Sequence, residues 1–142
     1  MPRKKPKETD VRRTTSVVQP IEPVIPKGIG FSFRYLQNDN PKFSFNNRDS
    51  RYFESLLLRL RDLSKLTVSE IINNRSKSLR CHLITWEDTT EPNGFGIPNE
   101  EEIVTSAYQF QISSNEHGRV HGFFIENIFY IVWLDPNHNL YQ

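Results

Sequence analysis

The chain has 142 residues, which is enough for one hydrophobic core. Its net charge of +1 is unevenly distributed. Residues 1–13 contain six basic and two acidic side chains, a net +4, which leaves −3 for the remainder. The ten Phe, five Tyr and two Trp exclude a wholly disordered chain, and the single cysteine excludes an internal disulfide. No apolar run approaches the length of a membrane span, which is about 18 residues. We therefore expect a cytoplasmic protein.

Residues 1–29 have the composition of a disordered tail. They are rich in Lys and Arg and then in proline, with Pro20, Pro23 and Pro26 at three-residue spacing and no helical or strand period. Such a tail either keeps the protein in solution or holds an anionic partner such as nucleic acid by charge. We expect a single α+β domain over residues 30–142.

The first half of this domain is predicted to contain a strand and two helices. Residues 31–36 alternate as a half-buried strand does. Asp49 or Ser50 is expected to cap a helix that continues to about Leu63, with one apolar stripe. The stripe consists of Phe53, Leu56, Leu57, Leu60 and Leu63. Thr67 and Glu70 have the spacing of a capping box, which predicts a second short helix ending near Asn73.

The second half is predicted to form an antiparallel sheet. Residues 83–86 are expected to be a short strand or extended segment, and residues 91–98, with two glycines and two prolines, a loop. Strands are predicted at 108–112, 119–125 and 128–134. Glu126 and Asn127 alone separate the last two, so a two-residue hairpin turn is expected. The fold class is therefore α+β, with a strand and two helices packed on a small antiparallel sheet.

The hairpin turn also assigns the faces of the sheet. It places Ile125 opposite Ile128, Phe123 opposite Tyr130, His121 opposite Val132 and Arg119 opposite Leu134. The bulkier face, which includes Trp133, is expected to pack on the helices. Arg119, His121, Gln109 and Gln111 are then left on a polar outer face, which is either a working surface or ordinary solvent-facing polarity.

The end of the chain adds chemistry to this face. Asp135, His138 and Tyr141 follow the strand that pairs with Arg119. A cation, an imidazole and a phenol close together can cleave a phosphodiester without a metal, because they supply charge stabilisation and proton transfer. His117 and His121 have zinc-like spacing without a clear third ligand, and adjacent Cys81 and His82 point apart in an extended segment. We expect no metal and no cofactor.

Three short motifs resemble the RelE/YoeB branch of bacterial toxins in the RelE/ParE superfamily. Residues 94–100, Gly-Phe-Gly-Ile-Pro-Asn-Glu, look like the Gly-x-Gly-x-Pro-Glu loop of that branch. Residues 115–121, Asn-Glu-His-Gly-Arg-Val-His, look like its Glu-His-Arg-Leu-Val-Tyr stretch with an inserted glycine, and His138 and Tyr141 stand where it ends in His-Tyr. The similarity covers residues 94–141. The sequence differs from the family pattern in two respects, because His138 and Tyr141 are not adjacent and the domain is acidic.

The resemblance implies a RelE-like fold and a ribosome-dependent mRNA endoribonuclease, with a cognate antitoxin, mRNA and the ribosome as partners. It implies catalytic roles for Arg119, which stabilises the scissile phosphate, for His138 and Tyr141, and for Glu100 as base or orienter. His121 is a further proton carrier on the same face. The substrate-binding candidates are Gln109, Gln111 and His117.

Two other functions stay open. The same fold could serve as a non-enzymatic interaction module, such as a phage or mobile-element protein that binds a host factor or nucleic acid, which the acidic domain favours. It could also be a topoisomerase-inhibiting relative of the toxins, in which case His138 is dispensable.

Overall fold

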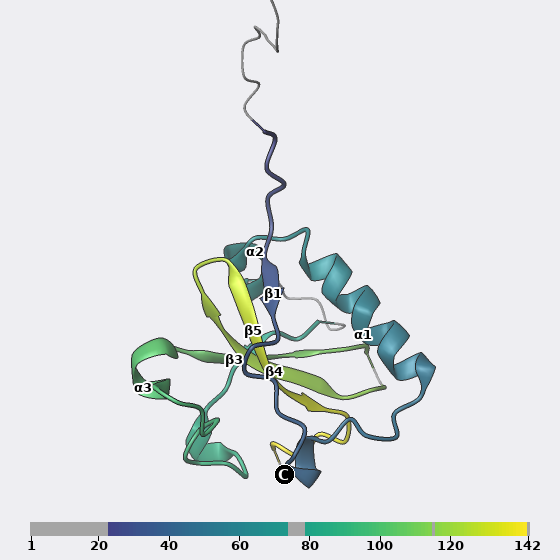
Figure 1. The fold of residues 1–142 in the computed structure, drawn as a ribbon, viewed down its shortest axis with the longest axis vertical. Coiled ribbons are helices and arrows are strands. Elements are labelled where there is room, and N and C mark those ends of the chain that lie inside the picture. The colour runs from purple at the N-terminus through teal and green to yellow at the C-terminus, as the bar shows by residue number, and fades with distance from the viewer. Residues whose placement is uncertain (1–22, 74–78, 115, 142) are drawn as a thin grey trace, which may run out of the picture.

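The structure, a computed structural model, describes residues 23–73, 79–114 and 116–141 as an α+β fold built on a five-stranded sheet (Figure 1). The predicted α+β class is confirmed, whereas residues 1–22 of the predicted tail lie outside the described residues. The elements in chain order are β1 (Gly30–Ser32), η1 (Pro41–Phe43), α1 (Ser50–Leu63), α2 (Val68–Ile72), β2 (His82–Leu83), η2 (Trp86–Asp88), α3 (Glu100–Ile103), β3 (Ala107–Gln111), β4 (Arg119–Ile125) and β5 (Ile128–Asp135).

The sheet is mixed, which corrects the expectation of an antiparallel one. Its strand order is β1-β5-β4-β3-β2; β1 runs parallel to β5, and the other neighbours are antiparallel. The first strand is also shorter than the predicted 31–36, since it ends at Ser32. Ile29, just before it, is buried, and its backbone N–H donates to the Leu66 carbonyl. Residues 29–30 are thereby fixed both to the sheet and to the segment that joins α1 to α2.

The two predicted helices form with the predicted caps. Asp49 accepts a hydrogen bond from the Tyr52 N–H at the start of α1, and Thr67 and Glu70 form a reciprocal capping box at α2. The predicted stripe is wrong at Leu57, which is 63% exposed, while Tyr52 is buried in its place. Figure 1 shows α1 along one side of the sheet and the unpredicted α3 on the other side of the view.

Both faces of the sheet are covered by apolar clusters. The first cluster, between the sheet and the helices, includes Leu56, Leu60, Phe110, Val120 and Ile131. The second cluster covers the opposite face with Phe43, Phe95, Phe123, Trp133 and Leu140. Its covering residues come from η1, the 91–98 loop and the C-terminal segment. The expectation of a solvent-facing polar sheet surface is therefore wrong, because irregular segments with aromatic side chains cover it.

The hairpin register holds as predicted near the turn and shifts beyond it. Ile125 pairs with Ile128 and Phe123 with Tyr130, but a bulge between His121 and Gly122 pairs His121 with Trp133 and Arg119 with Asp135. Val132 is the extra residue, and its carbonyl accepts from the Gln37 N–H instead. Val132 and Trp133 consequently both lie in the second cluster, which corrects the placement of Trp133 on the helix face.

The segment before β3 is less regular than expected. The predicted strand at 83–86 is limited to His82–Leu83 and is followed by the 3₁₀ turn η2, while residues 91–98 form the predicted loop. Within the described ranges, no helix combines the length and the apolarity required to cross a membrane.

Candidate functional site

Five polar side chains surround a small cavity of about 70 Å³ at the end of the hairpin. They come from β3, β4, the end of β5 and the C-terminal segment, and we call this the Arg119 pocket. Its lining residues are Gln109, Arg119, Asp135, His138 and Tyr141. The structure thus brings together four of the candidate site residues and Asp135, which the sequence analysis had named beside them without a role of its own.

Arg119 supplies the positive charge of the pocket. It is half-buried at the start of β4, and its Nε has no hydrogen-bond partner among the described residues. Burial lowers the pKa of Arg119, as does the nearby Arg80, while Asp135 and Tyr141 oppose that shift. A guanidinium stays charged despite such a shift, so the pocket presents a cation with a donor available to an anionic group.

Asp135 organises the wall of the pocket. Its side chain is almost fully buried and accepts hydrogen bonds from His121 Nε2 at 2.9 Å, from the Asn139 N–H at 2.7 Å and from the Leu140 N–H at 3.0 Å. Burial alone would raise the pKa of Asp135, but these hydrogen bonds lower it overall. Asp135 is therefore an ionised anchor for the turn that carries His138.

His121 lies behind the pocket rather than on its surface. Its side chain is 0% exposed and makes edge-on contacts with the rings of Phe43 and Trp133. Burial lowers the pKa of His121, opposed by the hydrogen bond to Asp135 and reinforced by Arg119 and His138. A neutral imidazole that donates Nε2–H to Asp135 leaves Nδ1 as an acceptor, and Nδ1 has no partner within the described part of the chain.

The two glutamines differ from each other. Both are buried, at 4% and 6% exposure, which corrects their placement on a solvent-facing surface. Gln109 lines the Arg119 pocket, and its Oε1 has no hydrogen-bond partner among the residues described. Gln111 pairs with Arg119 along the strands but does not line the pocket. Gln109 therefore offers a polar group to a bound molecule.

His138 and Tyr141 reach the pocket from the C-terminal segment. His138 is exposed and has a positive φ of 57°. The Tyr141 hydroxyl accepts a hydrogen bond of 3.0 Å from the Thr85 N–H. Its own O–H proton remains to donate elsewhere, so Tyr141 contributes a positioned donor beside Arg119.

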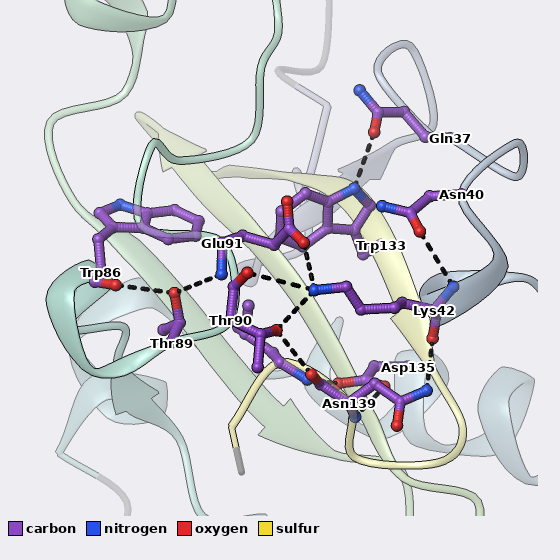
Figure 2. Close-up of polar contacts among 11 residues, drawn as sticks. Gln37, Asn40, Lys42, Trp86, Thr89, Thr90, Glu91, Trp133, Asp135 and Asn139 are labelled. Atoms are coloured by element: carbon purple, nitrogen blue, oxygen red, sulfur yellow. Dashed lines mark hydrogen bonds and ion pairs between the residues drawn. The ribbon is translucent and has the colours of Figure 1, made fainter.

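A polar clasp fixes this C-terminal segment (Figure 2). Lys42 Nζ donates to the carbonyl and hydroxyl of Thr90 and pairs with Glu91. Asn139 donates to the Lys42 carbonyl, and its own carbonyl accepts from the Thr90 hydroxyl. The sequence carries no signal for this clasp, because its members are 48 or more residues from their partners.

Glu100 and His117 are not part of the pocket. The Glu100 carboxylate accepts from the backbone N–H groups of Phe95, Gly96 and Ile97, so it holds the predicted loop in shape. His117 makes an edge-on contact with the Tyr52 ring, 5.7 Å between centroids. His117 and His121 thus have different surroundings.

Burial raises the pKa of Cys81 to about 11, which disfavours the thiolate that a nucleophile requires.

The size of the pocket limits what it accepts. One water needs about 10–15 Å³ of such space, so about 70 Å³ suits a group with the size of a phosphate. A nucleobase with its sugar does not fit. The chemistry available is therefore the binding of one anionic group by Arg119, with Gln109, His138 and Tyr141 beside it.

No protein-family model, no curated protein and no solved structure matches this chain.

Proposed function

We propose that the chain is a toxin-like mRNA endoribonuclease, ribosome-dependent, that cleaves RNA by metal-independent acid/base chemistry in the Arg119 pocket. The observation that supports this most is the convergence of Arg119, His138 and Tyr141, which are up to 22 positions apart in sequence, on one cavity of phosphate size. The element order of a strand, two helices and three final antiparallel strands supports the RelE/YoeB resemblance.

Four of the pocket residues, and His121 behind them, have a role in this proposal. The RNA 2′-oxygen bonds to the adjacent phosphorus while the bond to the 5′-oxygen breaks. His138, an exposed imidazole, takes the proton of the 2′-hydroxyl, and the leaving 5′-oxygen takes one from solvent. Arg119 stabilises the charge that develops on the phosphoryl oxygens, and Tyr141 orients the phosphate through its hydroxyl proton. Asp135 and His121 hold the turn of His138 in place.

Inducible expression followed by mapping of RNA 5′ ends tests the proposal. We expect growth arrest and new ends confined to translated messages for the wild type, and neither for Arg119→Ala or His138→Ala. Arg61→Ala, a guanidinium on the exposed face of α1, is the matched control and should behave as the wild type. The proposal is overturned by Arg119→Ala retaining both toxicity and cleavage.

A non-enzymatic interaction module is the second candidate. The net charge of −3 outside residues 1–13 favours it, because an acidic domain is poorly suited to a phosphate backbone. In this case the purified protein leaves RNA intact both free and on ribosomes, while Arg119→Ala weakens binding to a host factor. A topoisomerase-inhibiting protein would in addition tolerate His138→Ala.

A further inference from the structure

A second and larger hollow lies next to the Arg119 pocket. It has a volume of about 560 Å³, within the range of small-molecule sites, and is bounded by β2, η2, α3 and the start of β3. We call it the Trp86 groove. Its lining includes Leu83, Trp86, Glu101, Thr105 and Ala107.

The groove and the pocket are neighbours on the same face of the sheet. Ala107 lines the groove and Gln109 lines the pocket, and residues two apart on a strand point to the same side, about 7 Å from each other. The Ile84 N–H donates to the Ala107 carbonyl, and the next residue, Thr85, donates to Tyr141 of the pocket. Ile84 of the groove and Tyr141 of the pocket are thus joined through a single residue, Thr85.

We propose that the Trp86 groove is a nucleobase subsite that holds the base next to the phosphate bound in the Arg119 pocket. This deepens the proposed function and rests on it. The pocket is too small for a nucleoside, so a nucleotide whose phosphate enters it must place its base elsewhere. The groove is an adjoining hollow that is large enough, and at about 560 Å³ it is larger than the hollow of about 390 Å³ beside Asn137.

The chemistry of the groove fits a base and not a phosphate. Trp86 is half-buried, its ring held edge-on by Phe95 and Trp133, and single-stranded RNA is read by stacking bases on such aromatic side chains. Among the described residues, the lining contains no Lys or Arg, so the groove lacks the charge that a phosphate needs. Phosphate binding falls to Arg119, and base recognition to the groove.

Glu101 determines which bases the groove accepts. Its neighbour Glu100 uses its carboxylate on the 95–97 loop, whereas Glu101 is exposed on α3 at the groove. An ionised carboxylate only accepts hydrogen bonds, and it pairs with exocyclic amino groups of bases. Adenine, guanine and cytosine carry such a group, whereas uracil has only its ring N3–H to donate. The groove therefore selects an amino-bearing base over uracil.

The test compares base preference at the cleavage site among three proteins, with RNA 5′ ends mapped after expression. The wild type should prefer an amino-bearing base next to the cut, and Glu101→Ala should reduce that preference about fivefold while cleavage continues. Glu102→Ala, an exposed neighbour outside the groove, is the matched control and should leave the preference unchanged. Unchanged preference in Glu101→Ala overturns the subsite, whereas absence of cleavage by the wild type overturns the proposed function.

A crosslinking measurement separates RNA from other occupants. Leu83 lines the groove and is 57% exposed, so a photo-crosslinking amino acid there should not disturb the core. On translating ribosomes we expect crosslinks from this position to messenger RNA. Crosslinks exclusively to protein would identify the groove as a peptide-binding site and overturn the proposal.

Discussion

The buried His121–Asp135 pair makes the stability of the protein sensitive to mild acid. Neither side chain is exposed beyond 1%, and burial lowers the pKa of His121 despite its hydrogen bond to Asp135. The folded protein therefore holds a neutral imidazole, whereas in the unfolded chain His121 titrates near its ordinary pKa of about 6.5. Protonation favours the unfolded state, so the free energy of unfolding falls as the pH is lowered through about 6.5.

The size of this effect is bounded by one proton. The free energy of unfolding can change by at most about 1.4 kcal/mol per pH unit, and the loss between pH 7 and pH 5.5 is at most about 1.3 kcal/mol. For a domain of this size the melting temperature then falls by at most about 4 °C. Asp135 does not contribute in this window. Its lowered pKa gives stability that is lost only as the pH falls below about 4.

Replacement of His121 by Gln isolates the effect, because the amide can still donate to Asp135 but does not titrate. Urea unfolding at pH 7.0, 6.5, 6.0 and 5.5 should show a decline in the free energy of unfolding for the wild type and a weaker one for His121→Gln. His82→Gln, at an exposed position, is the control and should follow the wild type. Equal slopes for the wild type and His121→Gln would refute the reasoning.

Three further substitutions test how the site is supported. Glu100→Ala should destabilise the fold by about 2 kcal/mol in urea titrations, since three backbone N–H groups lose their acceptor. Cleavage per folded molecule should be unchanged. Lost cleavage at normal stability would instead show a catalytic role for Glu100. Gly118→Ala should lower the free energy of unfolding by about 3 kcal/mol, because Gly118 has a φ of 72° and a Cβ there would lie 2.0 Å from the Asp135 carbonyl oxygen. A melting temperature near that of the wild type would contradict this prediction. Thr67→Ala should cost about 1 kcal/mol through loss of the capping box, with Ser69→Ala as a control that leaves the cap intact.

Local signals in the sequence were enough to predict α1, α2 and the hairpin turn. Asp49, Thr67 and Glu70 act through residues three positions away, so their caps depend on no distant contact. The same is true of the turn at Glu126 and Asn127. The helical stripe was less reliable, because the choice between Tyr52 and Leu57 depends on what packs against α1.

The second apolar cluster could not be predicted from the sequence. Phe43, Phe95 and Leu140 lie in short irregular segments where no period of two or 3.6 marks a buried face. They cover the face of the sheet that carries His121 and Gln109, and this is why both side chains are buried. One part of the predicted polar surface stays open. It is the edge lined by Arg119, His138 and Tyr141, which the sequence analysis had grouped together.

One extra residue in β5 determines which groups form the site. Residues 128–134 are apolar without alternation, so two registers beyond the hairpin turn are equally compatible with the sequence. Without the bulge, Asp135 would point to the face opposite His121, where the helices pack. The bulge at Val132 places Trp133 and Asp135 on the His121 side, and the Asp135 carboxylate can then bind both His121 and the 139–140 backbone. The position of His138 beside Arg119 therefore depends on a bulge that is stabilised from outside the strand, by Gln37 binding the Val132 carbonyl and the Trp133 indole.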